Sequence, residues 1–259
     1  MKIVFAVTGI GQPYYEHKLE ILKSNLEKLN ELDEHKIQLI ISFYDDSAVP
    51  EWLNFMISEL NIELVIVRES NHIGSFIHKY LVPHKLDFDY LFLILDDVLL
   101  PDDFSFNKMI KTYEYVYNCN NKKTILSCSL SNDSKIGHKY MVTEPLKLQK
   151  TALYLLRKVK KCEYFFYIMN KRSYNRYYDI INSYPEYTER MWGVDLLLKK
   201  YHLNAYICDE IICKHFYSHG AGQFASICKE KMKILLKKPH PPDKCDVTQG
   251  INNNFTTFR

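Results

Sequence analysis

The sequence predicts an α/β fold built around a mainly parallel β-sheet, and two observations support this expectation. Short apolar runs rich in β-branched residues alternate with segments of helical periodicity over the first hundred residues. Such βαβ repeats place successive strands parallel and join them by right-handed crossovers. The later residues mix strands and helices less regularly, so we expect an α+β half there.

Four strands and the helices between them are expected in the first hundred residues. The strands are Lys2–Val7, Lys36–Phe43, Ile62–Val67 and Asp89–Leu95. Between the first two strands, one apolar helical stripe is formed by Tyr15, Leu19, Leu22, Leu26 and Leu29. Pro50 suits the first turn of the next helix, and Asn71 suits the N-cap of the third.

The remaining elements are predicted from the same patterns. Helices are expected through Phe106–Tyr113, Tyr174–Ile181, Met191–Tyr201 and residues 221–237, and strands over Thr124–Leu130, Glu163–Met169, Asn204–Cys208 and Glu210–Phe216. Residues 131–160 are polar and irregular, and we expect them to form a long loop that closes over the site. One domain is expected over residues 1–238, with halves at 1–100 and 101–238, followed by a tail over 239–259.

Composition excludes several classes of protein. A chain of 259 residues with 47% hydrophobic and 25% charged residues can bury a sizeable core. A net charge of +3 with scattered basic residues argues against nucleic acid as a partner. Seven cysteines without a Cys-x-x-Cys pair indicate reduced thiols. No apolar run is long enough for a signal peptide or a membrane span, so a cytoplasmic protein is expected.

Two adjacent carboxylates end the strongest strand pattern in the chain. The apolar run that begins at Asp89 stops abruptly at Asp96-Asp97. Ligands of open α/β sheets bind at the carboxyl ends of the strands, and close like charges call for a cation between them. Hard divalent ions take oxygen ligands and bridge to phosphates, so a metal–diphosphate site is the leading interpretation. The alternative is that the acids cap the helix that follows Pro101.

Three other strand ends carry polar or glycine residues that would share this edge of the sheet. They are Thr8-Gly9-Ile10-Gly11, Asp45-Asp46-Ser47 and the segment Arg68–Gly74. Each has a structural explanation when taken alone: a turn, a helix N-cap or a surface charge. Their joint placement on one edge favours a ligand site.

The later half contains a more specific pattern. Met191-Trp192-Gly193-Val194-Asp195 opens a predicted helix, and a strand that ends in His215 follows. This order resembles the acceptor-side half of GT-A glycosyltransferases, and the first half resembles the nucleotide-binding half of the same family, ending near its Asp-x-Asp motif. The resemblance covers roughly residues 2–220 and implies a Rossmann-type GT-A fold. Asp96-Asp97-Val98 has one acid fewer than Asp-x-Asp, and Val194 stands where the family often has Glu.

The resemblance implies a role for each residue at the metal–diphosphate site. Asp97 would ligate the metal, and Asp96 would reach the ribose or donor sugar, because successive strand side chains point in opposite directions. His215 would be a further metal ligand or a phosphate contact; a buried histidine at a strand end is its structural alternative. Mn²⁺ is the expected cofactor, with Mg²⁺ as the second choice, since manganese tolerates mixed carboxylate, imidazole and phosphate ligands.

The resemblance also implies catalytic and binding residues elsewhere. Asp195 would accept the proton of the attacking hydroxyl in an inverting transfer, or would merely cap its helix. Trp192 would stack on the acceptor sugar or pack in the core. Further contacts with the nucleotide sugar are assigned to Thr8, Asp45, Arg68, Gly74 and Lys79.

We therefore expect a metal-assisted hexosyltransferase that uses a UDP-linked sugar donor and a glycan or other hydroxyl acceptor. Two alternatives remain open. A nucleotidyltransferase has a similar sheet and metal chemistry, but it would favour a Gly-rich, basic loop after the first strand. A non-catalytic nucleotide-sugar-binding module is compatible with the incomplete Asp-x-Asp motif.

Overall fold

The computed structural model describes residues 1–11, 14–44, 47–69, 87–120, 123–131, 134, 145–159, 162, 165–182, 203–216 and 255–257. The predicted N-cap Asn71 and the helices expected over Met191–Tyr201 and 221–237 lie outside these ranges. Within these ranges, no helix is long and apolar enough to cross a membrane.

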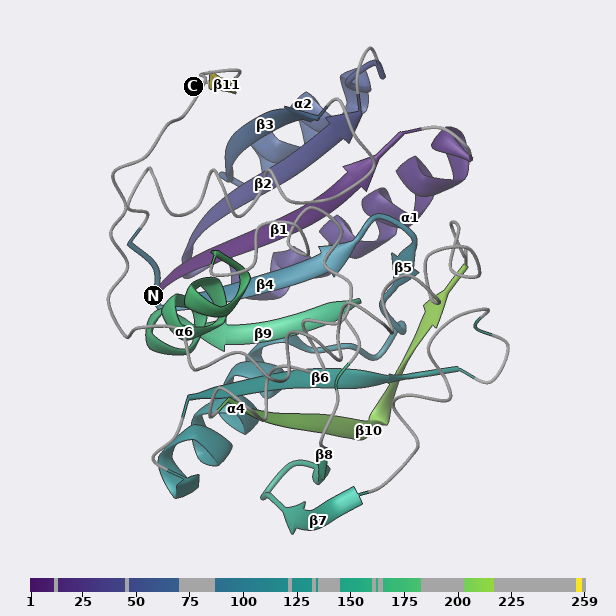
Figure 1. Ribbon diagram of the computed structural model, residues 1–259. Helices are drawn as coiled ribbons and strands as arrows, with labels where there is room; N and C mark the ends of the chain where they lie inside the picture. The colour runs from purple at the N-terminus through teal and green to yellow at the C-terminus, as the bar shows by residue number, and fades with distance from the viewer. Residues whose placement is uncertain are drawn as a thin grey trace.

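The first half of the sheet is parallel, as expected. It is built from β1 (Lys2–Ile10), β2 (Lys36–Tyr44), β3 (Glu63–Glu69) and β4 (Tyr90–Leu95) in the order β3-β2-β1-β4. All four carboxyl ends therefore lie at the same edge (Figure 1). Most residues in the middle of these strands are apolar and buried, because both faces of the sheet are covered.

The second half of the sheet is mixed. β9 (Phe166–Asn170) lies antiparallel between β4 and β6 (Thr124–Leu130), and β10 (Asn204–His215) runs parallel to β6. A hairpin of β7 (Pro145–Lys150) and β8 (Leu155–Val159) continues the sheet beyond β10. The short β5 (Val98–Leu99) pairs with the end of β10, and β11 (Phe255–Thr257) pairs antiparallel with β3. The fold class predicted from the sequence is confirmed.

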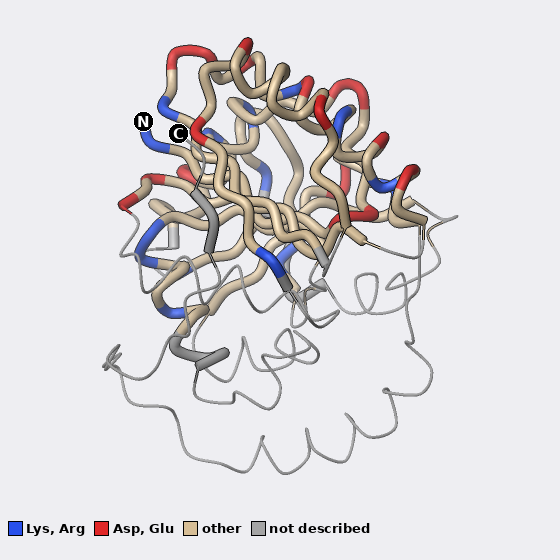
Figure 2. Tube along the Cα trace, turned by 90° about the horizontal axis from the view of Figure 1, so that it is seen from above, with Lys and Arg blue, Asp and Glu red and all other residues tan. Residues whose placement is uncertain are grey.

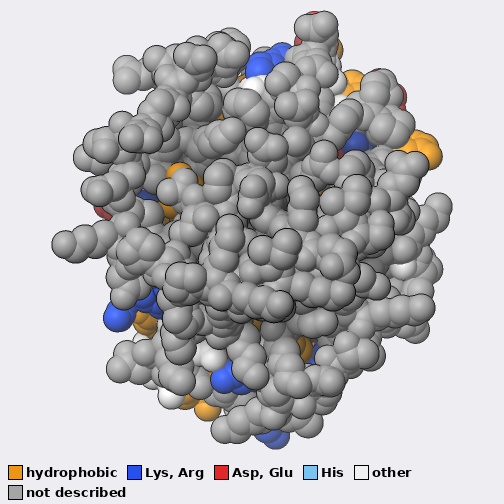
Figure 3. Space-filling view, viewed as in Figure 1, with side chains coloured by type: hydrophobic (Ala, Val, Ile, Leu, Met, Phe, Trp, Pro, Cys, Tyr) orange, Lys and Arg blue, Asp and Glu red, His pale blue; other side chains and the backbone are white. Residues whose placement is uncertain are grey.

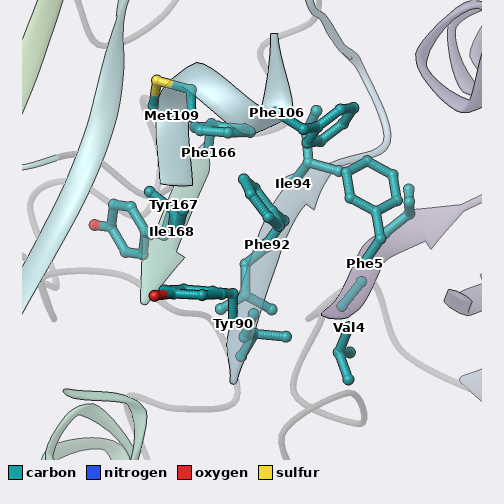
Figure 4. Packing of buried hydrophobic residues seen from close by; sticks show 14 of the residues in the cluster. Val4, Phe5, Tyr90, Phe92, Ile94, Phe106, Met109, Phe166, Tyr167 and Ile168 are labelled. Carbon is teal, nitrogen blue, oxygen red and sulfur yellow. The ribbon is translucent and has the colours of Figure 1, made fainter. Parts of the chain in front are cut away.

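Helices cover both faces of the sheet (Figure 1). α1 (Tyr15–Glu27) continues into the 3-10 helix η1 (Lys28–Leu32), and α2 (Glu51–Glu59) follows β2. α4 (Phe106–Asn120) packs on one face through Phe106, whose ring lies 5.6 Å from Phe5 and 5.0 Å from Phe92 (Figure 4). α6 (Lys171–Asn182) packs on the other face through Tyr177, which contacts Tyr167. This packing buries the central strands of the sheet on both faces.

The surface carries no dominant charge in the described part of the chain. Acidic and basic residues are interspersed along the trace (Figure 2), as a net charge of +3 would suggest. The described side chains that reach the face shown in Figure 3 are of mixed type, hydrophobic as well as charged.

Two expectations about the second half were wrong. Residues 131–160 are not irregular throughout, because 145–159 include the β7–β8 hairpin, which is closed by the Thr151 hydroxyl donating to the carbonyl of Tyr154 at 2.7 Å. The two strands expected at Asn204–Cys208 and Glu210–Phe216 are one strand, β10, with an irregularity between Cys208 and Ile212. The polar residues within this irregular stretch led to the prediction of two separate strands.

Candidate active site

The acid pair lies where β1, β4 and β10 end. The backbone N–H of Asp96 donates to the carbonyl of Thr8 at 3.1 Å, which ties the pair to β1. The N–H of Phe216 donates to the carbonyl of Asp97 at 3.1 Å, which ties it to the end of β10. The sheet edge thus brings together segments that are more than 200 positions apart in the sequence.

The two carboxylates have different partners, as the alternation of strand side chains predicts. Asp96 Oδ2 lies 2.6 Å from Lys18 Nζ of α1. Asp97 Oδ1 lies 3.0 Å from His215 Nε2, and each of these two side chains is only 4% exposed. The alternative that the pair caps the next helix is wrong, because Glu31 accepts from the N–H of Phe106 at the start of α4 at 2.9 Å.

Lys18 is a site residue that the sequence analysis missed. It is 2% exposed, and it also donates to the carbonyl of Gly11 at 3.1 Å. A signal was present: Lys18 falls in the helical stripe of Tyr15 and Leu22, at a spacing of three and then four residues. A charged residue at such a core-facing position requires a buried partner.

Asn25 lies two helical turns after Lys18 in the same stripe, and it was missed for the same reason. Its side-chain Nδ2 donates to the carbonyl of Val98 at 2.8 Å, and its Oδ1 accepts from the N–H of Leu100 at 3.0 Å. Both contacts are buried. α1 therefore holds the acid pair through Lys18 and the segment immediately after it through Asn25.

His215 is fixed by its own backbone as well as by Asp97. Its N–H donates to the hydroxyl of Ser134 at 3.1 Å, and Ser134 in turn lies 3.0 Å from the hydroxyl of Ser131. His215 also faces Val98 in the antiparallel pairing of β10 with β5. The imidazole is therefore held beside the acid pair by elements on both sides.

Burial changes the acidity of Asp96. Desolvation raises the pKa of the Asp96 carboxyl to about 7, and the negative charge of Asp97 acts in the same direction. The ammonium of Lys18 acts against both and favours the ionised form. The protonation of Asp96 therefore depends on its burial and on the opposite charges of Asp97 and Lys18.

The strand β1 extends further than expected. The strand continues through Thr8 and Gly9 to Ile10, and Thr8 is buried at 2% exposure. Gly9 has a φ of 83°, which favours glycine, and the pairing of β1 with β2 shifts register there. Its N–H donates to the hydroxyl of Ser42 at 2.6 Å. The amide of Gly9 is therefore already occupied within the sheet.

Arg68 lies at the carboxyl end of β3 and holds the chain that follows β2. Its guanidinium donates to the carbonyl of Ser47 and lies over the ring of Phe43 at 5.7 Å. The hydroxyl of Tyr15 donates to the carbonyl of Ala48 in the same segment. The other predicted site residues fall outside the described ranges: Asp45, Gly74, Lys79, Trp192 and Asp195.

The donor set at Asp97 and His215 fits a divalent cation. A carboxylate and an imidazole are both side chains that divalent transition-metal ions accept as ligands. The separation of Asp97 Oδ1 from His215 Nε2 is 3.0 Å. Among the described residues, no group of three or more His, Cys, Asp and Glu side chains is assembled for a metal. The remaining ligands of a cation here would come from water and from a bound phosphate group.

Comparisons with known proteins agree with this architecture. UDP-glucose pyrophosphorylase superposes with a TM-score of 0.53 at 12% identity, covering 90% of this chain and 98% of that one. GalNAc-T7 with UDP, GalNAc and Mn²⁺ superposes with a TM-score of 0.52 at 10% identity, covering 85% of this chain and 44% of that one. The protein has a GT-A-type fold. TarS from S. aureus gives a TM-score of 0.51 at 9% identity, covering 91% of this chain and 40% of that one.

The same fold is thus shared with glycosyltransferases and with sugar nucleotidyltransferases. The GT-A-type chain spans nearly the full length of the pyrophosphorylase but less than half of GalNAc-T7 and TarS. No protein-family model matches the sequence, and neither does any curated protein.

Proposed function

We propose that the protein is a glycosyltransferase that moves a sugar from a nucleotide-diphosphate sugar to a hydroxyl acceptor with the aid of a divalent cation. The observation that carries the proposal is the buried pair of Asp97 and His215, 3.0 Å apart at the carboxyl edge of the parallel strands. This edge is where ligands of open α/β sheets bind. UDP-linked donors are proposed by analogy with the UDP bound to GalNAc-T7.

Each candidate site residue has a proposed role that follows from its position in the fold. Asp97 and His215 would hold the cation, Mn²⁺ or Mg²⁺, which when bound neutralises the diphosphate that leaves the sugar. Asp96 would hold the ribose or donor sugar, and Thr8, Asp45, Arg68, Gly74 and Lys79 would contact the nucleotide. Asp195 would take the proton from the attacking hydroxyl, with inversion at the sugar carbon, and Trp192 would support the acceptor.

One contact at the end of β1 concerns the alternative of nucleotidyl transfer. Nucleotidyltransferases need a loop after the first strand whose backbone N–H groups are available to a phosphate. Here β1 continues through Thr8 to Ile10, and the N–H of Gly9 donates to Ser42 at 2.6 Å. The non-catalytic alternative differs in a measurable way, because it predicts binding of metal and nucleotide without turnover.

Product analysis tests the proposal. The protein is incubated with UDP, GDP, TDP and CMP sugars and Mn²⁺, and in parallel with nucleoside triphosphates and sugar 1-phosphates. Release of nucleoside diphosphate or monophosphate from a sugar donor supports glycosyl transfer. Release of pyrophosphate in the second reaction identifies a nucleotidyltransferase and overturns the proposal, and binding without either product identifies the non-catalytic module.

Asp195→Asn tests the proposed base. Loss of a positioned general base lowers turnover by ~10²–10⁴-fold and leaves donor binding intact. Asp103→Asn, at an exposed position after the acid pair, is the matched control. Turnover of Asp195→Asn within threefold of the control removes Asp195 from this role.

A further inference from the structure

Two side chains hold the short segment 47–50, which joins β2 to α2. The hydroxyl of Tyr15 in α1 donates to the carbonyl of Ala48, and the guanidinium of Arg68 in β3 donates to the carbonyl of Ser47. One donor comes from the helix that follows β1 and the other from β3, the two strands that flank β2 in the sheet. Successive carbonyls of one segment are therefore fixed by two different elements of the fold.

The contact made by Tyr15 is not required to satisfy a buried backbone group. Ala48 is exposed, and water can satisfy the carbonyl of an exposed residue. The hydroxyl therefore serves to fix where the segment lies. Burial and the charge of Glu16 raise the pKa of the Tyr15 hydroxyl, and the positive charge of Arg68 acts in the opposite direction. The hydroxyl keeps its proton at neutral pH and remains a donor.

The segment 47–50 lies at the edge of the sheet that carries the acid pair (Figure 1). Only β1 separates β2 from β4, so their carboxyl ends are two strand spacings apart, roughly 10 Å. This distance is comparable to the length of a nucleoside. On the other side of β4 the neighbouring strand, β9, is antiparallel, so the carboxyl ends continue only towards β1 and β2. A nucleotide with its diphosphate beside the acid pair would extend its nucleoside towards this segment.

We propose that Tyr15 is a positioning residue for recognition of the nucleoside. Together with Arg68 it holds the segment 47–50 in place, and the nucleoside lies against that segment. The first turn of α1 also carries Lys18, which contacts Asp96 at 2.6 Å. One helical turn thus sets the position of the segment relative to the acid pair. This inference rests on the proposed function and gives Tyr15 a role beyond core packing.

Calorimetry with Mn²⁺ present separates recognition of the nucleoside from recognition of the phosphates. The probes are inorganic pyrophosphate and whichever of UDP, GDP, TDP and CMP binds the wild-type protein most tightly. Tyr15→Phe removes the hydroxyl and keeps the ring. Loss of this one hydrogen bond weakens nucleotide binding roughly three- to tenfold, whereas pyrophosphate binding stays within about twofold of the wild-type value. Tyr14→Phe, at a position 55% exposed before α1, keeps both wild-type affinities.

Two outcomes of this comparison overturn the inference. A folded Tyr15→Phe protein that binds the nucleotide as tightly as Tyr14→Phe shows that the hydroxyl does not position the nucleoside. An equal loss of affinity for nucleotide and pyrophosphate shows that the hydroxyl supports the fold in general. If the wild-type protein binds none of the four nucleotides, the proposed function itself fails, and that result is distinct because it is seen without any substitution.

A double variant tests whether Tyr15 and Arg68 act through the same segment. Arg68→Lys keeps the positive charge and loses the planar group of donors. If both residues hold the segment, either change alone releases it, so the loss of nucleotide affinity in Tyr15→Phe/Arg68→Lys is smaller than the product of the two single losses. Losses that multiply show that the two residues act independently and overturn their joint role.

Discussion

Replacing Asn25 with alanine removes the contact that fixes the chain immediately after the acid pair. The carbonyl of Val98 loses a donor at 2.8 Å, and the N–H of Leu100 loses an acceptor at 3.0 Å, both in buried surroundings. Each buried group left without a partner costs roughly 1–3 kcal/mol, so the free energy of unfolding should fall by about 2–6 kcal/mol. The segment that carries the acids should also loosen.

Urea denaturation followed by circular dichroism measures the first effect, and hydrogen exchange at the amide of Leu100 measures the second. Asn30→Ala is the matched control, because Asn30 is exposed in η1, where substitutions change stability by about 0.5 kcal/mol or less. A loss below ~1 kcal/mol in Asn25→Ala, with unchanged exchange at Leu100, would show that Asn25 does not hold this segment.

Two further predictions concern the same edge of the sheet. Gly9→Ala should lower the free energy of unfolding by about 1–2 kcal/mol, because an alanine at φ 83° is strained; an unchanged midpoint in urea would contradict this. In EDTA, the stability of the wild-type protein should fall as the pH rises from about 4 to 7, because burial raises the pKa of Asp96 to about 7 and the folded state holds its proton longer than the unfolded state. Asp96→Asn should flatten this slope, and an equal slope in both proteins would refute the assignment.

Much of the first half could be predicted because its signals are local. The strands β1 to β4 are apolar runs buried on both faces, and their bounds agree with the sequence to within three residues. The helical stripe from Tyr15 likewise becomes α1 and η1. The order of the strands in the second half depends on contacts between distant parts of the chain. There β9 lies antiparallel between β4 and β6, and the local sequence pattern of a strand does not indicate which strands will pair with it.

The same distinction applies to the site. Asp96 and Asp97 could be predicted as site residues because they follow an apolar run, and His215 because it lies at the end of a predicted strand. Lys18 and Asn25 gave a weaker signal, as polar residues in an apolar stripe, because their partners lie more than 70 positions away in the sequence. Glu31, which caps α4 from η1, gave no sequence signal at all, since capping residues are expected next to the helix they cap.

The most direct test of the central claim is the binding of UDP, GDP, TDP and CMP, by calorimetry, to the wild-type protein and to Asp97→Asn, each with Mn²⁺ and with EDTA. Asp103→Asn serves as the control. If Asp97 and His215 hold a cation together with a nucleotide, one nucleotide class binds the wild-type and control proteins only with Mn²⁺, and Asp97→Asn loses that binding. Equal affinity with Mn²⁺ and EDTA, or unchanged affinity in Asp97→Asn, would contradict the claim and make the pair of Asp97 and His215 a structural contact.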